Sequence, residues 1–326
     1  MISTLITKDA AKLAILVKKG GVVIFPTETV YGIGADSTNE TACLRIYEIK
    51  NRPLDNPLIS HFESIKQIAT YCELDDLAKF LLETFSPGPL TLVLPKKKSP
   101  YIFTMGLDTL AVRIPDHTDA STLIREAGVP ISAPSANVSG RPSLTREVDV
   151  IETFDGKVDG ILQGQAPIVG IESTVLDVSG PIPTLLRPGK VTVADLLGII
   201  PNLIYAKETD NKVSESDLDT IVRSPGMKYR HYSPLAKVVV LEAKEFINEF
   251  TKHQNDTKVS FIGFDFVARN QNDISLQDNI EYMNKLYSYF VDSDKNQIDV
   301  CFCQTPIDDS YRIALLNRLH KAESKK

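Results

Sequence analysis

The segment VVIFPTETVYGIG, residues 22–34, joins a short apolar run to a polar loop. The apolar residues 22–25 follow a helical pattern at residues 9–19 that Gly20 and Gly21 close, and they predict a buried strand. The loop after them carries two threonines, a glutamate and a tyrosine. Loops at the carboxyl ends of strands are where α/β sheets bind ligands, so this loop is a candidate ligand-binding segment. A turn capped by its own threonine side chains explains the same residues equally well.

Outward from this strand, the first 200 residues mix helical and strand patterns without a strict βαβ rhythm. The patterns predict helices at residues 39–50, 76–84, 120–127 and 193–200 and after Ser64, and strands at residues 57–61, 91–94, 110–114 and 131–134. This irregular order favours a twisted mixed α/β sheet with helices over a doubly wound parallel sheet.

The last 90 residues alternate regularly between strands and helices. The predicted strands are VVVLEA, VSFIGF and DVCFC, and the predicted helices cover residues 244–250, 277–289 and 308–320. This alternation indicates a small three-layer parallel α/β domain, Rossmann-like in architecture. We therefore expect a first domain at residues 1–204, a linker at 205–235 and a second domain at 236–326.

The composition limits the classes of protein that this chain can be. Its 326 residues are enough for two domains of ordinary size. A formal net charge of -6 argues against a surface devoted to nucleic acid, although a local basic pocket is compatible with it. No apolar run is long enough to span a membrane, and the N-terminal residues lack the pattern of a secretion signal. No CxxC pair or Cys–His spacing suggests a metal, so we expect a cytoplasmic protein with reduced core thiols and no metal site.

The sequence lacks the glycine-rich motifs that bind phosphate, so its candidate anion-binding residues are cationic side chains. The sequence has no GxxxxGK[ST], and GIGA at residues 32–35 lacks the third glycine of a dinucleotide fingerprint. Lys50 and Arg52 leave a predicted helix just before Pro53. They could simply offset the helix dipole, but a proline-stiffened path would aim both at one point, which suits a phosphate or carboxylate. Arg113 ends another predicted strand, where its guanidinium could hold a carboxylate.

Small residues and hydroxyls follow the predicted strand at 131–134. The segment SAPSANVSGRPS, residues 132–143, would let backbone N–H groups approach a ligand and would add neutral donors, although a serine-rich surface loop is the simpler alternative. Ser173, Thr174 and Arg187 add similar groups beside later strand-like runs. No Ser-His-Asp set or carboxylate pair accompanies them. Such a site favours phosphoryl or nucleotidyl chemistry that works by positioning and charge stabilisation.

Several of these segments form an ordered set of motifs. PTETVYG, KNRP with NPL, PGPLT, VRIP, SAPSAN, EST and LRPG follow one another over the first 200 residues and resemble the YrdC-like family. The stretch SPGMKYRHYSP, residues 224–234, with the small domain after it, resembles the long, two-domain form of that family. The resemblance implies a twisted mixed α/β first domain with a concave basic face. It also implies condensation of L-threonine, bicarbonate and ATP, with Mg2+, into threonylcarbamoyl-adenylate and pyrophosphate. A downstream tRNA threonylcarbamoyl transferase would use this product, and direct tRNA contact is a further expectation.

The resemblance assigns roles to individual positions. Phosphate binding and transition-state stabilisation are implied for Lys50, Arg52, Ser135 and Asn137. ATP binding is implied for Arg52, Asn56, Thr109, Ser135, Ser143 and Arg187. Threonine binding is implied for Thr29, His61, Arg113, Ala133 and Ser173, with Thr27 and Tyr31 shaping that pocket.

Two departures from the family pattern and two alternatives accompany this interpretation. Ser86 replaces a usual aromatic residue before PGPLT, and residues 163–165, Gln-Gly-Gln, replace a usual Asp-Gly-Gly. A non-catalytic double-stranded RNA or tRNA binder could use the same basic face, but it would not require Ser135 and Asn137. Carbamoyl transfer in hydrogenase maturation uses a related domain, but the Cys-rich zinc-finger segments and acylphosphatase-like region that accompany it are missing here.

The stretch SPGMKYRHYSP carries more chemistry than a linker needs. We expect it to fold back over the pocket as a lid, with Lys228 or Arg230 on the triphosphate. Tyr229 or Tyr232 would then pack on ATP. The alternative is a rigid strap between domains whose aromatic residues pack on the second domain.

Overall fold

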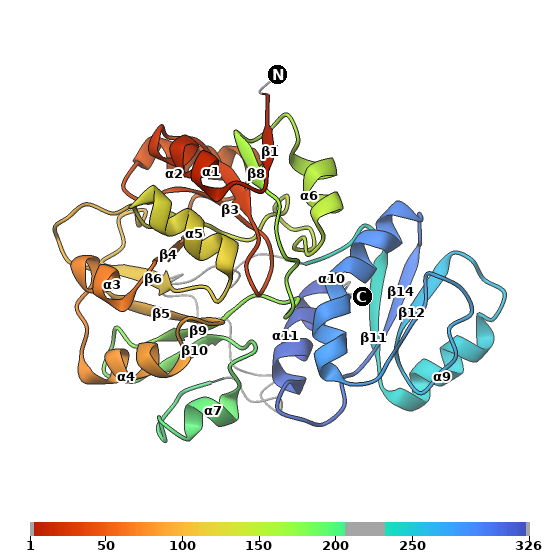
Figure 1. The fold of residues 1–326 in the computed structure, drawn as a ribbon. Coiled ribbons are helices and arrows are strands. Elements are labelled where there is room, and N and C mark those ends of the chain that lie inside the picture. The colour runs from red at the N-terminus through yellow and green to blue at the C-terminus, as the bar shows by residue number, and fades with distance from the viewer. Residues whose placement is uncertain (1–2, 206–231, 324–326) are drawn as a thin grey trace.

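The computed structural model describes residues 3–205 and 232–323, which form two α/β units side by side (Figure 1). The first unit is built on a ten-stranded sheet and the second on a four-stranded sheet. Of the predicted lid residues, Lys228, Tyr229 and Arg230 lie outside the described residues, whereas Tyr232 lies within them.

The ten-stranded sheet has the order β1-β8-β2-β3-β7-β4-β6-β5-β9-β10. Its strands are β1 (Leu5–Thr7), β2 (Val23–Phe25), β3 (Gly32–Asp36), β4 (Ile59–His61), β5 (Leu90–Pro95), β6 (Thr109–Arg113), β7 (Ile131–Ser132), β8 (Gly160–Leu162), β9 (Thr174–Asp177) and β10 (Thr184–Arg187). Strand β2 is antiparallel to β3 but parallel to β8, and β6 is parallel to β4 but antiparallel to β5. The predicted twisted mixed sheet is therefore confirmed.

Most of the helices described in the first unit begin at a residue whose side chain caps them. They are α1 (Ala10–Lys18), α2 (Glu40–Lys50), α3 (Ile65–Tyr71), α4 (Asp76–Phe85), α5 (Thr118–Ala127), α6 (Glu147–Phe154) and α7 (Val193–Leu197). Asp9, Asn39 and Ser64 accept hydrogen bonds from the free N–H groups of α1, α2 and α3. Helix α2 ends at Asn51, whose left-handed φ of 50° turns the chain directly before Arg52.

Both faces of strand β2 are covered. Val23 and Phe25 pack in a cluster with α1 and α5, whereas Ile24 packs in a second cluster with α2 and α6. Alternate side chains of a strand point to opposite faces, so a strand covered on both sides is apolar throughout. This explains why the four-residue run at 22–25 signals the fold so clearly.

Strand β3 gives the GIGA segment a structural explanation. A Cβ on Gly34 would lie 2.7 Å from Ile131 and 3.0 Å from Phe25, so glycine lets β2, β3 and β7 pack closely. The sequence patterns also missed helix α6. They missed β1, β8 and β13 because strands of three residues carry little periodicity.

The second unit is a parallel sheet in the order β11-β14-β12-β13. Its strands are β11 (Lys237–Leu241), β12 (Val259–Phe264), β13 (Ile274–Leu276) and β14 (Val300–Gln304), and its helices are α9 (Ala243–Lys252), α10 (Asn279–Lys295) and α11 (Arg312–Ala322). Helices α10 and α11 cover the side turned toward the first unit, and α9 covers the opposite side (Figure 1). The predicted three-layer parallel domain is confirmed, with β13 as an additional strand.

Charged pairs join α10 to the first unit. Arg146 pairs with Asp292 at 2.5 Å, and Lys295 pairs with Asp149 at 2.6 Å. Gly170 lies against the backbone of α10, where a Cβ would come within 2.3 Å of the Met283 carbonyl oxygen. The units are thus packed backbone to backbone at one point. Within residues 3–205 and 232–323, no helix has the length and apolar character needed to cross a membrane.

Candidate functional site

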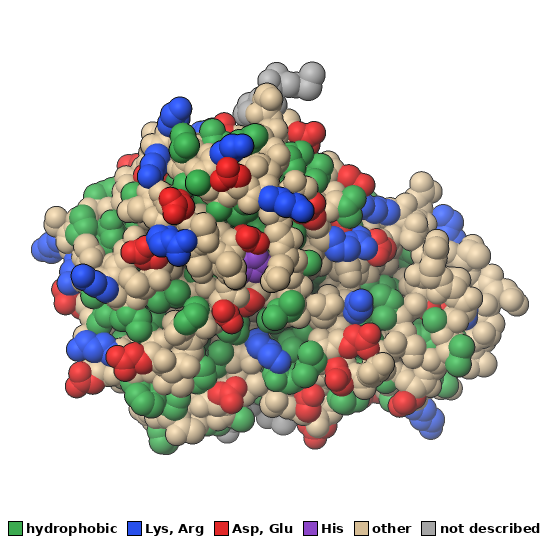
Figure 2. All heavy atoms as spheres, viewed as in Figure 1, with side chains coloured by type: hydrophobic (Ala, Val, Ile, Leu, Met, Phe, Trp, Pro, Cys, Tyr) green, Lys and Arg blue, Asp and Glu red, His purple; other side chains and the backbone are tan. Residues whose placement is uncertain are grey.

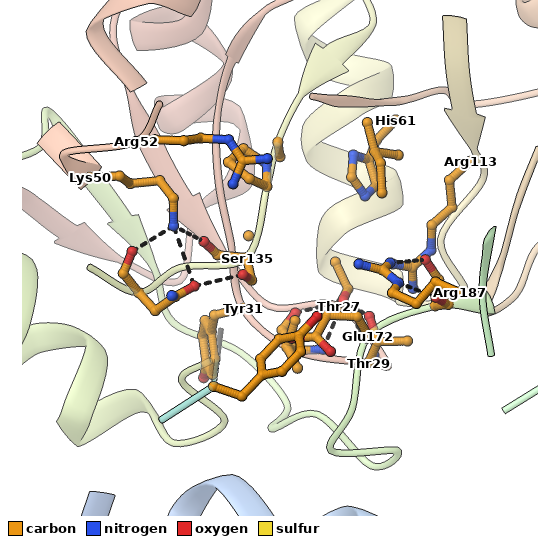
Figure 3. A pocket seen from close by; sticks show the side chains of 18 of the residues that line it. Thr27, Thr29, Tyr31, Lys50, Arg52, His61, Arg113, Ser135, Glu172 and Arg187 are labelled. Carbon is orange, nitrogen blue, oxygen red and sulfur yellow. Dashed lines mark hydrogen bonds between the residues drawn. The ribbon is translucent and has the colours of Figure 1, made fainter. Parts of the chain in front are cut away.

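A pocket opens over the middle of the ten-stranded sheet, where several strands and α2 end (Figure 3). Among the sequence-predicted residues, those lining it are Thr27, Thr29, Tyr31, Lys50, Arg52, His61, Arg113, Ala133, Ser135, Asn137, Ser173, Arg187 and Tyr232. The chain thus brings together residues that are up to about 200 positions apart, because antiparallel and parallel strands deliver their ends to the same region.

Lys50 organises the loop at residues 135–139. Its ammonium, with the residue only 1% exposed, donates to the carbonyl oxygens of Ser135 and Asn137, both at 2.5 Å, and to the Asn137 amide oxygen at 3.3 Å. The Ser135 hydroxyl donates to the same amide oxygen at 2.6 Å. Burial and then the Arg52 charge lower the pKa of Lys50 well below its usual value. The three oxygen acceptors oppose this lowering of the pKa because they stabilise the charged ammonium form.

Arg52 is fixed by the proline-rich turn that follows it. Its Nε and Nη2 donate to the carbonyl oxygens of Asn56 and Pro57, each at 3.0 Å. Burial lowers the pKa of Arg52 to about 10, so the guanidinium stays charged at neutral pH. The rigid basic turn expected from the sequence therefore exists, and it presents Lys50 and Arg52 to one pocket.

The PTETVYG loop closes on itself through its threonines. The Thr27 and Thr29 hydroxyls lie 2.8 Å apart, and the Thr27 hydroxyl donates to the Val30 carbonyl oxygen at 2.6 Å. This is the self-capped turn, and it also lines the pocket, so the two interpretations of the loop are compatible. The Tyr31 side chain is fully buried, and burial raises the pKa of its hydroxyl.

His61 and Arg113 are neighbours on parallel strands β4 and β6. Burial and then the Arg113 charge lower the pKa of His61 to about 3, which keeps the ring neutral at neutral pH. Arg113 Nη2 lies 2.7 Å from a carboxylate oxygen of Glu28, an ion pair whose angles do not meet hydrogen-bond geometry. Sequence reasoning missed Glu28 as a partner of Arg113. Its position between two threonines of the PTETVYG motif was the available signal.

Ser173 and Arg187 form one unit at the ends of β9 and β10. Arg187 Nε donates to the Ser173 carbonyl oxygen at 2.9 Å, and Nη2 donates to the Ser173 hydroxyl oxygen at 3.1 Å. That hydroxyl also lies 2.8 Å from the Thr91 hydroxyl on β5. Burial lowers the pKa of Arg187 below its usual value.

Glu172 is a pocket carboxylate that the sequence analysis did not select. Its side chain accepts hydrogen bonds from the Ser143 hydroxyl at 2.5 Å and, from the second unit, the Tyr287 hydroxyl at 2.9 Å and Arg318 at 3.1 Å. Burial alone would raise the pKa of Glu172, but the charges of Arg318 and Arg187 and the Ser143 hydrogen bond together hold it below its usual value. The EST motif gave a signal for this acid, but nothing in the sequence indicated its partners 115 and 146 residues away.

Tyr232 combines features of both linker interpretations. It lines the pocket, and its ring stacks on Tyr287 of α10 with centroids 5.4 Å apart. Its φ of 67° is left-handed, which directs the chain sharply at this point.

Three of the predicted ATP residues within the described part of the chain are not among the residues that line the pocket. Ser143 is fully buried behind Glu172, and Thr109 is half-buried at the start of β6. Asn56 is 2% exposed, and neither polar atom of its side chain finds a hydrogen-bond partner among the described residues.

The pocket therefore contains several fixed cations, many neutral hydroxyls and a carboxylate that other residues already hold. Fixed cations can bring two anions together, and prearranged donors can stabilise charge that moves during a reaction.

Comparisons with known proteins agree with this geometry. A family model described as "Telomere recombination" (Sua5_yciO_yrdC) matches residues 15–189, and a model described as "Threonylcarbamoyl-AMP synthase, C-terminal domain" (Sua5_C) matches residues 191–324. The chain is 38% identical to a threonylcarbamoyl-AMP synthase of Pyrococcus abyssi over 94% of this chain and 91% of that protein. It is also 38% identical to one from Bacillus subtilis, over 96% of this chain and 92% of that protein. A solved structure of P. abyssi Sua5 complexed with L-threonine is similar with a TM-score of 0.86 at 37% identity, covering 99% of this chain and 97% of that one.

Proposed function

The chain belongs to the Sua5/YciO/YrdC family, and on that premise we propose that it is a threonylcarbamoyl-AMP synthase. It would join L-threonine, bicarbonate and ATP into threonylcarbamoyl-AMP and release pyrophosphate. The pocket gives the main support, because it gathers Lys50, Arg52 and Arg187 with Thr29 and Ser173 in one place.

The reaction must bring two anions together. The amino nitrogen of threonine first attacks the carbon of bicarbonate and water leaves, which gives a carbamate. A carbamate oxygen then attacks the α-phosphorus of ATP while pyrophosphate leaves. Both the carbamate and the triphosphate are negative, so their approach is unfavourable unless fixed positive charge lies between them. Cations that are already held in place lose little free energy to reorganisation when the reaction occurs.

We assign the phosphate side of the reaction to Lys50, Arg52, Ser135 and Asn137. The hydrogen bonds from Lys50 to the loop at 135–139 hold Ser135 and Asn137 beside the ammonium. Arg52 adds a guanidinium whose direction is fixed by two carbonyl oxygens. This group would stabilise the charge that develops on the α-phosphate and on the leaving pyrophosphate.

The ATP contacts would extend beyond this group. We assign them also to Asn56, Thr109, Ser143, Arg187, Tyr229, Arg230 and Tyr232. The unsatisfied side-chain amide of Asn56 supports its assignment, because a buried amide without a partner costs free energy that a ligand can recover. Ser143 would act through Glu172, to which it donates.

We assign threonine to Thr29, His61, Arg113, Ala133 and Ser173. A neutral His61 can exchange hydrogen bonds with the threonine hydroxyl without adding charge. Arg113 would bind the threonine carboxylate while Glu28 holds its guanidinium from the other side. The similar Sua5 structure complexed with L-threonine supports a threonine site in this fold.

Mg2+ would enter as part of the nucleotide substrate. Within residues 3–205 and 232–323, no group of three or more His, Cys, Asp or Glu side chains could hold a metal ion, and Glu172 already accepts from Arg318, Tyr287 and Ser143. The described residues therefore do not fit a resident metal. A Mg2+ ion on the phosphates needs no such ligand set.

We also propose that the product serves a downstream tRNA threonylcarbamoyl transferase and that the activity is cytoplasmic. We further propose that the chain divides into a first domain at residues 1–204, a lid at residues 205–235 and a second domain at residues 236–326.

On the face seen in Figure 2, Lys and Arg are interspersed with Asp and Glu. This mixture is unlike the continuous basic surface of a non-specific RNA binder.

Pyrophosphate release by the purified protein with ATP and bicarbonate tests the proposal. Release should depend on L-threonine, and the adenylate should be detected by mass spectrometry. Release without threonine, or tight RNA binding without ATP binding, would reject the synthase.

A further inference from the structure

Arg318 is a buried cation from the second unit that reaches the wall of the pocket in the first. It is fully buried and lies on α11, whereas its partner Glu172 lines the pocket and is 5% exposed. The pair is separated by 3.1 Å between Arg318 Nε and Glu172 Oε2.

The guanidinium of Arg318 holds two separate segments of the first unit. Nη2 donates to the Glu172 carbonyl oxygen at 3.2 Å, and Nη1 donates to the Pro188 carbonyl oxygen at 2.6 Å. In the sequence, Glu172 directly precedes Ser173 and Pro188 directly follows Arg187, and both Ser173 and Arg187 line the pocket. One planar fork from the second unit therefore fixes the backbone on both sides of the Ser173–Arg187 unit.

Tyr287 on α10 completes this junction. Its hydroxyl donates to Glu172 at 2.9 Å, and its ring stacks on Tyr232. The Arg318 guanidinium also lies 5.7 Å from the centre of the Tyr232 ring. Two helices of the second unit thus converge on a single carboxylate.

We propose that Arg318, with Tyr287, is a positioning residue for substrate binding: it anchors Glu172 and thereby sets the places of Ser173 and Arg187 in the pocket. This role rests on the proposed function for the identity of the ligands, and it makes the second unit part of the binding site. Neither residue needs to touch substrate.

The physical reason is the cost of an uncompensated buried charge. If Arg318 is replaced by an apolar residue, Glu172 keeps its negative charge beside Arg187 and draws that guanidinium away from Ser173. Neutralising Glu172 at the same time removes the unpaired charge, so it should restore much of what the single change loses.

The test compares Arg318→Met, Arg318→Lys, Glu172→Gln and the double variant Glu172→Gln/Arg318→Met in the full chain. Two matched controls separate positioning from general damage. Arg269→Met removes a buried arginine that pairs with Asp273 inside the second unit, and Arg146→Met removes an ion pair of the interface away from the pocket. Circular dichroism first establishes that each variant is folded.

Calorimetry with ATP alone gives the first readout. We expect Arg318→Met to weaken ATP binding about tenfold or more, because truncating one partner of a buried charge pair has effects of at least that size. Arg318→Lys keeps the charge but not the planar guanidinium, so it should retain only part of the ATP affinity that Arg318→Met loses. The double variant should retain most of that affinity. Both controls should bind ATP within about twofold of the wild type. Equal binding by Arg318→Met and the wild type, or equal weakening in Arg269→Met, would overturn the proposal.

Hydrogen exchange without ligand gives a second readout that does not depend on the proposed function. Peptides covering residues 171–177 and 184–190 should exchange about tenfold faster in Arg318→Met than in the wild type or Arg269→Met. Unchanged exchange there would reject the positioning role even if ATP binding failed for another reason. Absence of ATP binding by the wild type, with faster exchange in Arg318→Met, would reject the synthase and keep the anchor. If Arg318→Met does not fold, Glu172→Gln and Arg318→Lys answer the same two questions.

Discussion

His61 should make the protein lose stability in acid, and the variant His61→Asn should remove this loss. The imidazole is 4% exposed, and burial together with the Arg113 charge lowers its pKa from 6.5 to about 3. The unfolded chain takes up a proton on this residue below pH 6.5, whereas the folded chain does not do so until about pH 3. Stability from this residue is therefore complete above pH 6.5 and falls as the pH drops toward 3.

The magnitude follows from the two pKa values. Between pH 7 and pH 4.5 the protonation of His61 in the unfolded chain should cost the folded state about 2.5 kcal/mol. Denaturant unfolding of the wild type and of His61→Asn at both pH values measures this cost. The contributions of all other titrating groups cancel when the unfolding free energies of the two proteins are subtracted. We expect the difference in unfolding free energy between the two proteins to change by that amount, in favour of the variant at pH 4.5.

A constant difference between wild type and His61→Asn from pH 7 to pH 4.5 would refute the reasoning. It would mean that the ring takes up its proton in the folded protein as easily as in the unfolded chain.

Three further changes test other parts of the site and the interface. Lys50→Met should lower kcat about 100-fold or more, because it removes a fixed cation from the residues proposed to bind the phosphates. Steady-state pyrophosphate release measures kcat, and turnover equal to the wild type would contradict the assignment. Arg187→Lys keeps the charge but loses the paired hydrogen bonds to Ser173, so the KM for ATP should rise about tenfold; an unchanged KM would show that the fork is not needed. Gly170→Ala should destabilise the chain by about 1–3 kcal/mol, because its φ is 87° and a Cβ would lie 2.3 Å from a backbone oxygen of α10. Thermal unfolding measures this last change, with Gly180→Ala as its control because a Cβ there meets nothing within 4 Å, and equal midpoints for the two variants would contradict the close packing of the units.

Local sequence determined the elements whose signals are complete within a few residues. Helices were expected from residue 9, from residue 39 and after Ser64, and the structure shows Asp9, Asn39 and Ser64 as their N-caps. The apolar run at 22–25 predicted a buried strand, since a strand covered on both faces must be apolar at every position. Short strands such as β8 and β13 escaped prediction because three residues cannot show a period.

The candidate site followed from residue chemistry and from the family motifs, but its internal pairing did not. Cations and hydroxyls at strand ends could be recognised one motif at a time. The sequence could not show that Glu28 holds Arg113 or that Arg318 reaches Glu172. Pairs of this kind depend on how strands and helices from different parts of the chain are arranged.

The sequence by itself therefore determined the classes of element, the mixed and parallel sheets and the chemical character of the pocket. Those properties depend on side-chain type and short-range periodicity, which the chain carries locally. Only the tertiary structure decided which charges neutralise one another and that the second unit forms part of the wall behind the pocket. Electrostatic pairing acts over a few ångströms in space, and residues 146 positions apart become neighbours only when the two units pack.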